Sequence, residues 1–186
     1  MNVLVINAGS SSLKYQLVHV ENHAVIAKGI CERVGSANAF HKHGIAENEV
    51  VIDAQMADHD AAMALVLDSL INSDDAPIKS LDEIDAIGHR IVQGGKYFDK
   101  SVLIDDDVIE KIDELAELAP LHNKAALMGI RACQKHMPNI PMVAVFDTSF
   151  FQTLPPKAYM YPLPYEYYEK YAIRKYGAHG TSHRYI

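Results

Sequence analysis

The order of the apolar segments along the chain constrains its fold more than any other feature. Short strand-like segments come first, at residues 3–6, 13–18 and 24–34, with only turns between them. From Asp58 onward, segments of helix and strand character alternate. A meander that passes into such an alternation predicts an α/β domain with a mixed sheet. We expect helices to cover both faces of that sheet.

Within the meander, residues 3–6 form a continuous apolar run, which predicts a strand buried on both faces. Over residues 13–18 apolar and polar side chains alternate, so this segment predicts a half-buried strand that returns antiparallel from the turn NAGSSS. The polar, glycine-containing stretch 35–48 and the apolar residues after it predict a hairpin excursion. We expect its histidines, among them His41 and His43, to be solvated.

Helical periodicity defines much of the remaining chain. Asp58 is suited to cap a helix in which Met63, Val66 and Leu70 share one face, and this helix is expected to end near Asn72. The later elements are predicted as strands at 84–92 and 141–146, helices at 108–116, 126–137 and 165–176, and a turn at GAHGTSH.

Charge and cysteine content exclude several classes of function. The formal net charge is −7 and the pI is about 5.7, so nucleic acid and anionic membrane surfaces would repel the chain. Cys31 and Cys133 lie far apart in apolar contexts, which predicts free thiols in a reducing compartment. No apolar run reaches the ~18–20 residues of a membrane span. We therefore expect a cytoplasmic protein that binds neither nucleic acid nor membrane.

The segment NAGSSSLK has two interpretations. It lacks the second glycine of the pattern GxxxxGK[S/T], and it leads into a strand, so no helix dipole supports an anion there. Its backbone N–H groups and the hydroxyls of Ser10, Ser11 and Ser12 can still converge on phosphate oxygens. Lys14 can add a positive charge, and Asn7 can offer an amide oxygen to a hydrated magnesium ion. The alternative is a hairpin whose serines satisfy their own turn.

Two charged residues accompany predicted buried strands. Arg90, in GHRIVQGG, must be paired, either in an internal ion pair with an aspartate or as a guanidinium held ready for a carboxylate or phosphate. Asp147, in VAVFDTSFF, follows an apolar strand at its carboxyl end, where ligands gather in α/β sheets. It either serves a ligand there or caps the following turn through Thr148 or Ser149.

Histidines provide the last candidates. His179 and His183 in YGAHGTSHRY are four residues apart, as zinc ligands on a helix can be, but the glycine between them argues against a regular helix there. His179 is interpreted either as a hydrogen-bond donor to a charged oxygen or as a satisfied surface residue. His122, in APLHNK, is either a site residue or simply a residue at a helix start.

Together, these segments resemble one family. NAGSSSLK, GHRIVQGG, APLHNKAAL, FDTSFFQTLP and YGAHGTSHRY have the order and spacing found in acetate kinases, over the whole chain. The resemblance implies a ribonuclease-H-like domain of the actin and sugar-kinase type, with a mixed five-stranded sheet and helices on both faces. Family members are about twice this length and have two similar domains. Residues 1–186 are thus expected to be the N-terminal domain, with the C-terminal domain absent.

The resemblance also implies roles for single residues. Asn7 would contact magnesium and Lys14 would contact ATP, with Ser10 and Ser12 lining the same site. Of the catalytic residues, Arg90 would bind the substrate, Asp147 would have an acid/base role and His179 would stabilise the transition state. The acyl side of the site would be lined by Val92, Leu121 and His122.

Two positions depart from the family's pattern. Ala178 stands where a phenylalanine often closes the acyl pocket, which leaves room for a longer acyl chain. Gln93 stands where many members carry histidine.

The implied reaction is the reversible in-line transfer of the γ-phosphoryl group of ATP to acetate, with Mg²⁺, or Mn²⁺ in its place, bridging the phosphates. Acetate is already ionised at neutral pH, so we expect Asp147 to hold a magnesium-bound water or to orient Arg90 rather than to accept a proton. The alternatives are a kinase for propionate or another short-chain carboxylate, and a fragment that binds ligand without turnover. The resemblance further implies a homodimer of the full-length protein.

Overall fold

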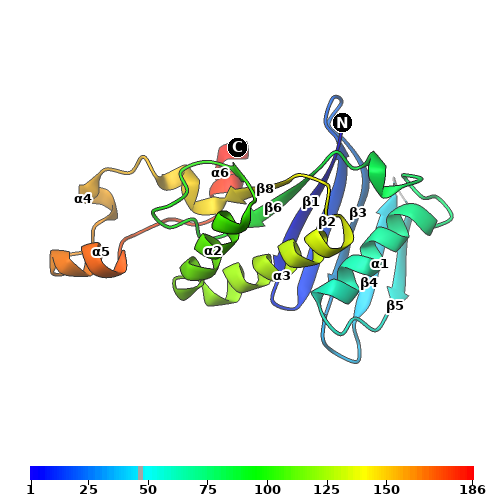
Figure 1. The fold of residues 1–186 in the computed structure, drawn as a ribbon, viewed down its shortest axis with the longest axis horizontal. Helices are drawn as coiled ribbons and strands as arrows, with labels where there is room; N and C mark the ends of the chain where they lie inside the picture. The colour runs from blue at the N-terminus through cyan, green and yellow to red at the C-terminus, as the bar shows by residue number, and fades with distance from the viewer. Residues whose placement is uncertain (46–47) are drawn as a thin grey trace.

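A computed structural model describes residues 1–45 and 48–186. The described chain is built on one eight-stranded sheet with the strand order β5-β4-β3-β2-β1-β6-β8-β7 (Figure 1). The strands are β1 (Asn2–Gly9), β2 (Ser12–His19), β3 (Ala24–Glu32), β4 (Phe40–Ile45), β5 (Asn48–Asp53), β6 (Ala86–Ile91), β7 (Val102–Leu103) and β8 (Met142–Phe146).

The sheet is mixed, as predicted. Strands β1 to β5 form an antiparallel meander, β1 pairs parallel with β6, and β6 pairs parallel with β8. The expected number of five strands is wrong. The meander extends through β4 and β5, and the short β7 adds an antiparallel edge to β8.

In the described parts of the chain, six helices and three short 3-10 turns connect and follow the strands. Asp58 caps the first helix as predicted, since its carboxylate accepts a hydrogen bond from the Ala61 N–H at 2.9 Å. The helices are α1 (His59–Asn72), α2 (Asp106–Glu114), α3 (Pro120–His136), α4 (Pro156–Tyr159), α5 (Tyr165–Tyr171) and α6 (Gly180–Tyr185), and the 3-10 turns are η1 (Leu81–Glu83), η2 (Leu115–Glu117) and η3 (Asp147–Phe151).

The large helices cover one face of the sheet, so the expectation of helices on both faces is wrong for the described residues. Leu4 and Ile6 of β1 are buried in the core with side chains of α1 and α3, whereas Val5 faces the other way and is 41% exposed. Right-handed crossovers that move in one direction across a sheet leave their helices on the same side. Among the helices of the described ranges, α6 alone, which packs on η3 and β8, reaches the opposite side, and we call that side the open face.

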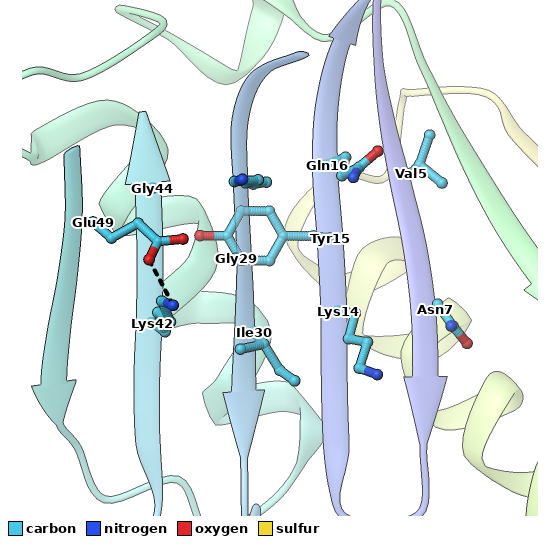
Figure 2. A pocket seen from close by; sticks show the side chains of 11 residues that line it. Val5, Asn7, Lys14, Tyr15, Gln16, Gly29, Ile30, Lys42, Gly44 and Glu49 are labelled. Carbon is cyan, nitrogen blue, oxygen red and sulfur yellow. Dashed lines mark ion pairs between the residues drawn. The ribbon is translucent and has the colours of Figure 1, made fainter. Parts of the chain in front are cut away.

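His41 and His43 are buried rather than solvated, being 0% and 5% exposed. Both point from β4 toward the helices, where the Tyr15 hydroxyl lies 3.0 Å from His41 Nε2 and 2.5 Å from His43 Nδ1. Figure 2 shows the Tyr15 ring lying across Gly29 toward β4. A Cβ at Gly29 would lie 2.5 Å from the Tyr15 hydroxyl oxygen, so this glycine makes room for the cluster.

The C-terminal region also differs in part from the prediction. Helix α5 ends at Tyr171, because Ala172 adopts the left-handed conformation (φ 52°, ψ 33°) and so breaks the predicted helix 165–176. The predicted turn GAHGTSH instead contains the start of α6.

Cys31 and Cys133 are free, buried thiols, as expected. Within the described ranges, no helix has the length and apolar character needed to cross a membrane.

Candidate active site

The polar residues of the predicted site project from the open face at one end of the sheet. Asn7 of β1 is paired directly with Lys14 of β2, so the two side chains share that face, as Figure 2 shows. Arg90 of β6 comes one residue after the last β1–β6 pair, and Asp147 comes directly after β8. Because β1, β6 and β8 are parallel, their carboxyl ends meet at the same edge, where α/β sheets bind ligands.

The NAGSSS turn is a two-residue hairpin that leads into a strand, as predicted. Gly9 pairs with Ser12, and a Cβ on Gly9 would lie only 2.8 Å from the Ser12 hydroxyl oxygen. His59 at the start of α1 fixes the turn, since its Nε2 lies 2.7 Å from the Gly9 carbonyl oxygen. Among the described residues, the hydroxyls of Ser10, Ser11 and Ser12 have no hydrogen-bond partner. These hydroxyls are therefore available to a ligand.

Arg90 and Asp147 form the ion pair that was one of the two interpretations of Arg90. Arg90 Nη2 donates to Asp147 Oδ2 at 2.7 Å, and Nε donates to the same oxygen at 3.2 Å. The Asp147 side chain is 1% exposed, whereas that of Arg90 remains 32% exposed. Burial raises the pKa of Asp147, but hydrogen bonds from Arg90 and Thr181 outweigh it and leave the pKa below its usual range. The pair is therefore charged at neutral pH and presents a guanidinium to solvent.

His179 lies beside this pair because of an unusual backbone conformation. It adopts the left-handed region (φ 55°, ψ 31°) and immediately precedes α6. Its Nδ1 is 3.4 Å from Arg90 Nη2, and because arginine only donates, this contact leaves the imidazole proton on Nε2. The ring of His183 stacks on Phe150 instead, so the two histidines point to different surroundings and do not share a ligand position.

Asn7, Arg90, His179 and Thr181 line one open cavity of about 920 Å³. Its floor is the apolar part of the open face, which includes Val5 and Val145. The cavity thus combines an apolar surface with a cationic, hydrogen-bonding edge, a combination suited to a small anion that carries an apolar group.

The three predicted acyl-side residues lie elsewhere. Val92 is half-buried just after β6, while Leu121 is 73% exposed and His122 is also exposed at the start of α3. None of them lines the cavity that Arg90 and His179 share. Ala178, directly before His179, is exposed.

Two residues that sequence reasoning did not assign to the site hold the loop after Arg90. Asn123 is fully buried, accepts the Gln93 N–H at 3.1 Å and donates to the Gln93 carbonyl at 2.9 Å. The Thr148 hydroxyl accepts the Gly94 N–H at 2.8 Å. The predicted helix 126–137 does not include Asn123, but Asn123 lies three residues before Ala126 and so continues its apolar stripe, where a polar side chain must find partners.

The fold and the site define an α/β domain that presents a partly exposed guanidinium and a histidine at the carboxyl ends of its parallel strands. The chain belongs to the acetokinase family, whose sequence profile matches residues 2–186. The family resemblance of the sequence motifs is thereby confirmed.

Individual relatives give the same result. Acetate kinases of Thermoanaerobacterium thermosaccharolyticum and Thermotoga maritima are 56% and 54% identical over 186 residues, which is 100% of this chain and 46% of each relative. The crystal structure of Porphyromonas gingivalis acetate kinase matches 98% of this chain and 46% of its own, with a TM-score of 0.94 and 46% identity. A propionate kinase from Francisella tularensis matches 99% of this chain and 46% of its own, with a TM-score of 0.92 and 43% identity. The chain thus spans about half the length of these relatives.

Proposed function

We propose that these residues form the N-terminal domain of an acetate kinase, which reversibly transfers the γ-phosphoryl group of ATP to acetate and yields acetyl phosphate and ADP. The observation that carries the proposal is the guanidinium of Arg90, fixed by Asp147 and flanked by His179 at the edge of a partly apolar cavity. The identity of 54–56% to acetate kinases supports the same activity.

The proposed chemistry consists mainly of positioning and charge stabilisation. Both substrates are anions, so bringing acetate toward the γ-phosphate requires a cation between them. Arg90 supplies that charge, and the Nε2–H of His179 supplies a hydrogen-bond donor to the phosphoryl oxygens. Lys14 and the serine hydroxyls Ser10 and Ser12 face the same edge and would contact ATP phosphates.

In this mechanism Asp147 positions Arg90 and accepts no proton from acetate. Both of its oxygens accept hydrogen bonds from Arg90, and Oδ1 also accepts one from Thr181, so both oxygens are engaged within the domain. Acetate is ionised at neutral pH and has no proton to give. The acyl-side residues Val92, Leu121 and His122 are proposed to contact the substrate from the other side of the site.

The residues of this domain fit a magnesium ion that is carried mainly by ATP. Mg²⁺ usually combines phosphate and water ligands with one or two protein oxygens. The Asn7 amide lines the cavity and has no hydrogen-bond partner among the described residues, so it can serve as such a ligand. Elsewhere in the described ranges, no group of three or more histidines, cysteines and carboxylates is arranged to hold a metal. When bound, Mg²⁺, or Mn²⁺ in its place, would neutralise phosphate charge.

We further infer that the complete kinase has a second domain of the same actin-like type and forms a homodimer. The relatives are about twice as long as the matched region, and the meander followed by parallel strands agrees with a ribonuclease-H-like half. The second domain would supply the adenosine pocket and further charges for the transition state. The substrates suit a cytoplasmic enzyme.

The test is the trapping of acetyl phosphate as its hydroxamate, with ATP, Mg²⁺ and acetate. A full-length protein that carries this domain should form the hydroxamate, whereas residues 1–186 alone should show no efficient turnover. Absence of product from the full-length protein at saturating acetate would overturn the proposed activity.

A second substrate, propionate, is favoured by one observation. Ala178 is small and exposed beside His179, so it leaves space at the acyl side of the site. A propionate kinase is also among the similar structures. The ratio of kcat/KM for propionate and acetate decides the preference, and Ala178→Phe should shift that ratio toward acetate.

A further inference from the structure

The carboxylate of Asp147 is held from two sides. Oδ2 accepts hydrogen bonds from both Nη2 and Nε of Arg90, while Oδ1 accepts a longer one from the same Nε at 3.3 Å and the hydroxyl hydrogen of Thr181. The terminal torsion of aspartate has only a broad energy minimum, so a carboxylate held by one partner alone can rotate. The contact with Thr181 therefore reinforces the longer Arg90 contact on Oδ1, and together the two residues fix the plane of the carboxylate against the Arg90 guanidinium.

The backbone before Thr181 adopts a conformation that brings about this contact. His179 is left-handed, a conformation that is strained for a residue other than glycine. At Gly180 a Cβ would lie 1.8 Å from the Asp147 carbonyl oxygen, so only glycine allows α6 to approach this closely. Strain and close approach at two successive residues place the Thr181 hydroxyl on the carboxylate.

We propose that Thr181 is a positioning residue of the kinase, which fixes Asp147 so that Arg90 is held in the orientation that binds the transferring phosphoryl group and acetate. The inference rests on the proposed function and assigns no contact between Thr181 and the substrate. Because the hydroxyl acts as a donor to a charged oxygen, serine can replace it and valine, of the same shape, cannot.

The test compares Thr181→Val and Thr181→Ser in the full-length enzyme. The valine variant should lower kcat/KM for acetate about 10- to 100-fold, as expected for the loss of a hydrogen bond to a charged group, and serine should restore it to within about threefold of wild type. Thr153→Val is the matched control, because Thr153 is exposed and outside the site, and it should leave kcat/KM unchanged. If the valine variant is unstable, Thr181→Ala takes its place against serine.

Two further measurements separate positioning from a structural role. In an enzyme that already carries Asp147→Asn, adding Thr181→Val should lower kcat/KM for acetate little further, since the two residues act through one contact. In ¹³C NMR titrations, the pKa of the Asp147 carboxyl should rise in Thr181→Val, because a hydrogen bond to the charged form is lost. This titration does not depend on catalysis, so it distinguishes failure of the inference from failure of the proposed activity. Unchanged kcat/KM in an active enzyme, additive effects in the double variant, or an unchanged pKa of Asp147 would each overturn the inference.

Discussion

Arg90 and Asp147 are 57 residues apart in the chain, yet the guanidinium of one lies against the carboxylate of the other at 2.7 Å. The contact arises because β6 and β8 are parallel neighbours and Arg90 is paired with Val145 in their register. Asp147 follows two residues later and so emerges on the same face, where it meets the arginine. The geometry of the proposed active site is thus a direct result of strand register.

Asp147→Asn tests the role of this ion pair. The amide keeps the shape of the side chain but loses the charge that orients Arg90, so kcat/KM for acetate should fall about 100-fold or more. The hydroxamate assay and the Mg²⁺ dependence of the rate measure the effect. Asp99→Asn, at an exposed position outside the site, is the matched control. Near-normal turnover with an unchanged Mg²⁺ requirement would show that Asp147 neither orients Arg90 nor serves the metal.

Gly180→Ala tests the docking of α6. The new Cβ would collide with the carbonyl of Asp147, so α6 should move away and carry His179 with it. We expect a loss of at least about tenfold in kcat/KM and faster amide hydrogen exchange in α6. Gly88→Ala is the control for the effect of a glycine-to-alanine change on folding, because a Cβ at Gly88 meets nothing within 4 Å. Its melting temperature should therefore change little. Full activity of Gly180→Ala would contradict the close packing.

Two buried histidines predict how stability depends on pH. Burial, with a smaller contribution from His43, lowers the pKa of His41 to about 4, and burial lowers that of His89 to about 4. In the unfolded chain both titrate near 6.5, so the folded state favours the neutral form. Their contribution to the free energy of unfolding is therefore fully present above pH 6.5 and is lost as the pH falls toward 4. The loss of stability is on the order of 3 kcal/mol for each histidine.

The variant that checks this dependence is His89→Leu. The Nε2 atom of His89 is buried without a partner among the described residues, so leucine removes both the titration and an unsatisfied polar atom. Urea unfolding between pH 7 and pH 4 should show a smaller loss of stability for the variant than for wild type. Parallel curves would show that His89 does not contribute to acid unfolding.

Asn123→Ala tests the anchoring of the loop after Arg90. Three hydrogen bonds join the Asn123 side chain to main-chain groups of Gln93 and Ile112. Truncation of this side chain to alanine leaves those buried main-chain groups without a partner. The free energy of unfolding should fall by about 2–4 kcal/mol. Asn139→Ala, at an exposed turn, should be close to neutral in the same denaturant titration. An equal effect in both variants would mean that the loop does not depend on Asn123.

Local rules predicted much of the fold. The cap at Asp58, the hairpin at Gly9 and the order of meander and crossovers all follow from residues close together in the chain. The sequence of β4 predicts a polar excursion instead of a strand, because the burial of its two histidines depends on Tyr15, which comes from another strand. The burial of Val5 was overestimated, since an apolar run does not indicate which face of a sheet the helices cover.

The sequence predicted which residues are candidates for the site, but it did not predict how their side chains contact one another. Pairing of Arg90 with an aspartate followed from the cost of burying a lone charge, but the choice of Asp147 needed the strand register. Thr181 gave no signal in the sequence, because its contact depends on the left-handed conformation of His179. Such backbone conformations are set by packing between distant segments and not by local propensity.

The central position of β1 has a consequence for the order of assembly during synthesis. Strand β1 pairs with β2 through a short hairpin, but its other edge is completed only by β6, at residues 86–91. Parallel pairing over such a separation forms slowly and leaves an open edge meanwhile. Since Arg90, Asp147 and Thr181 all come from segments that follow the meander in the chain, the edge that they form can be assembled only after β6, β8 and α6 have joined the sheet.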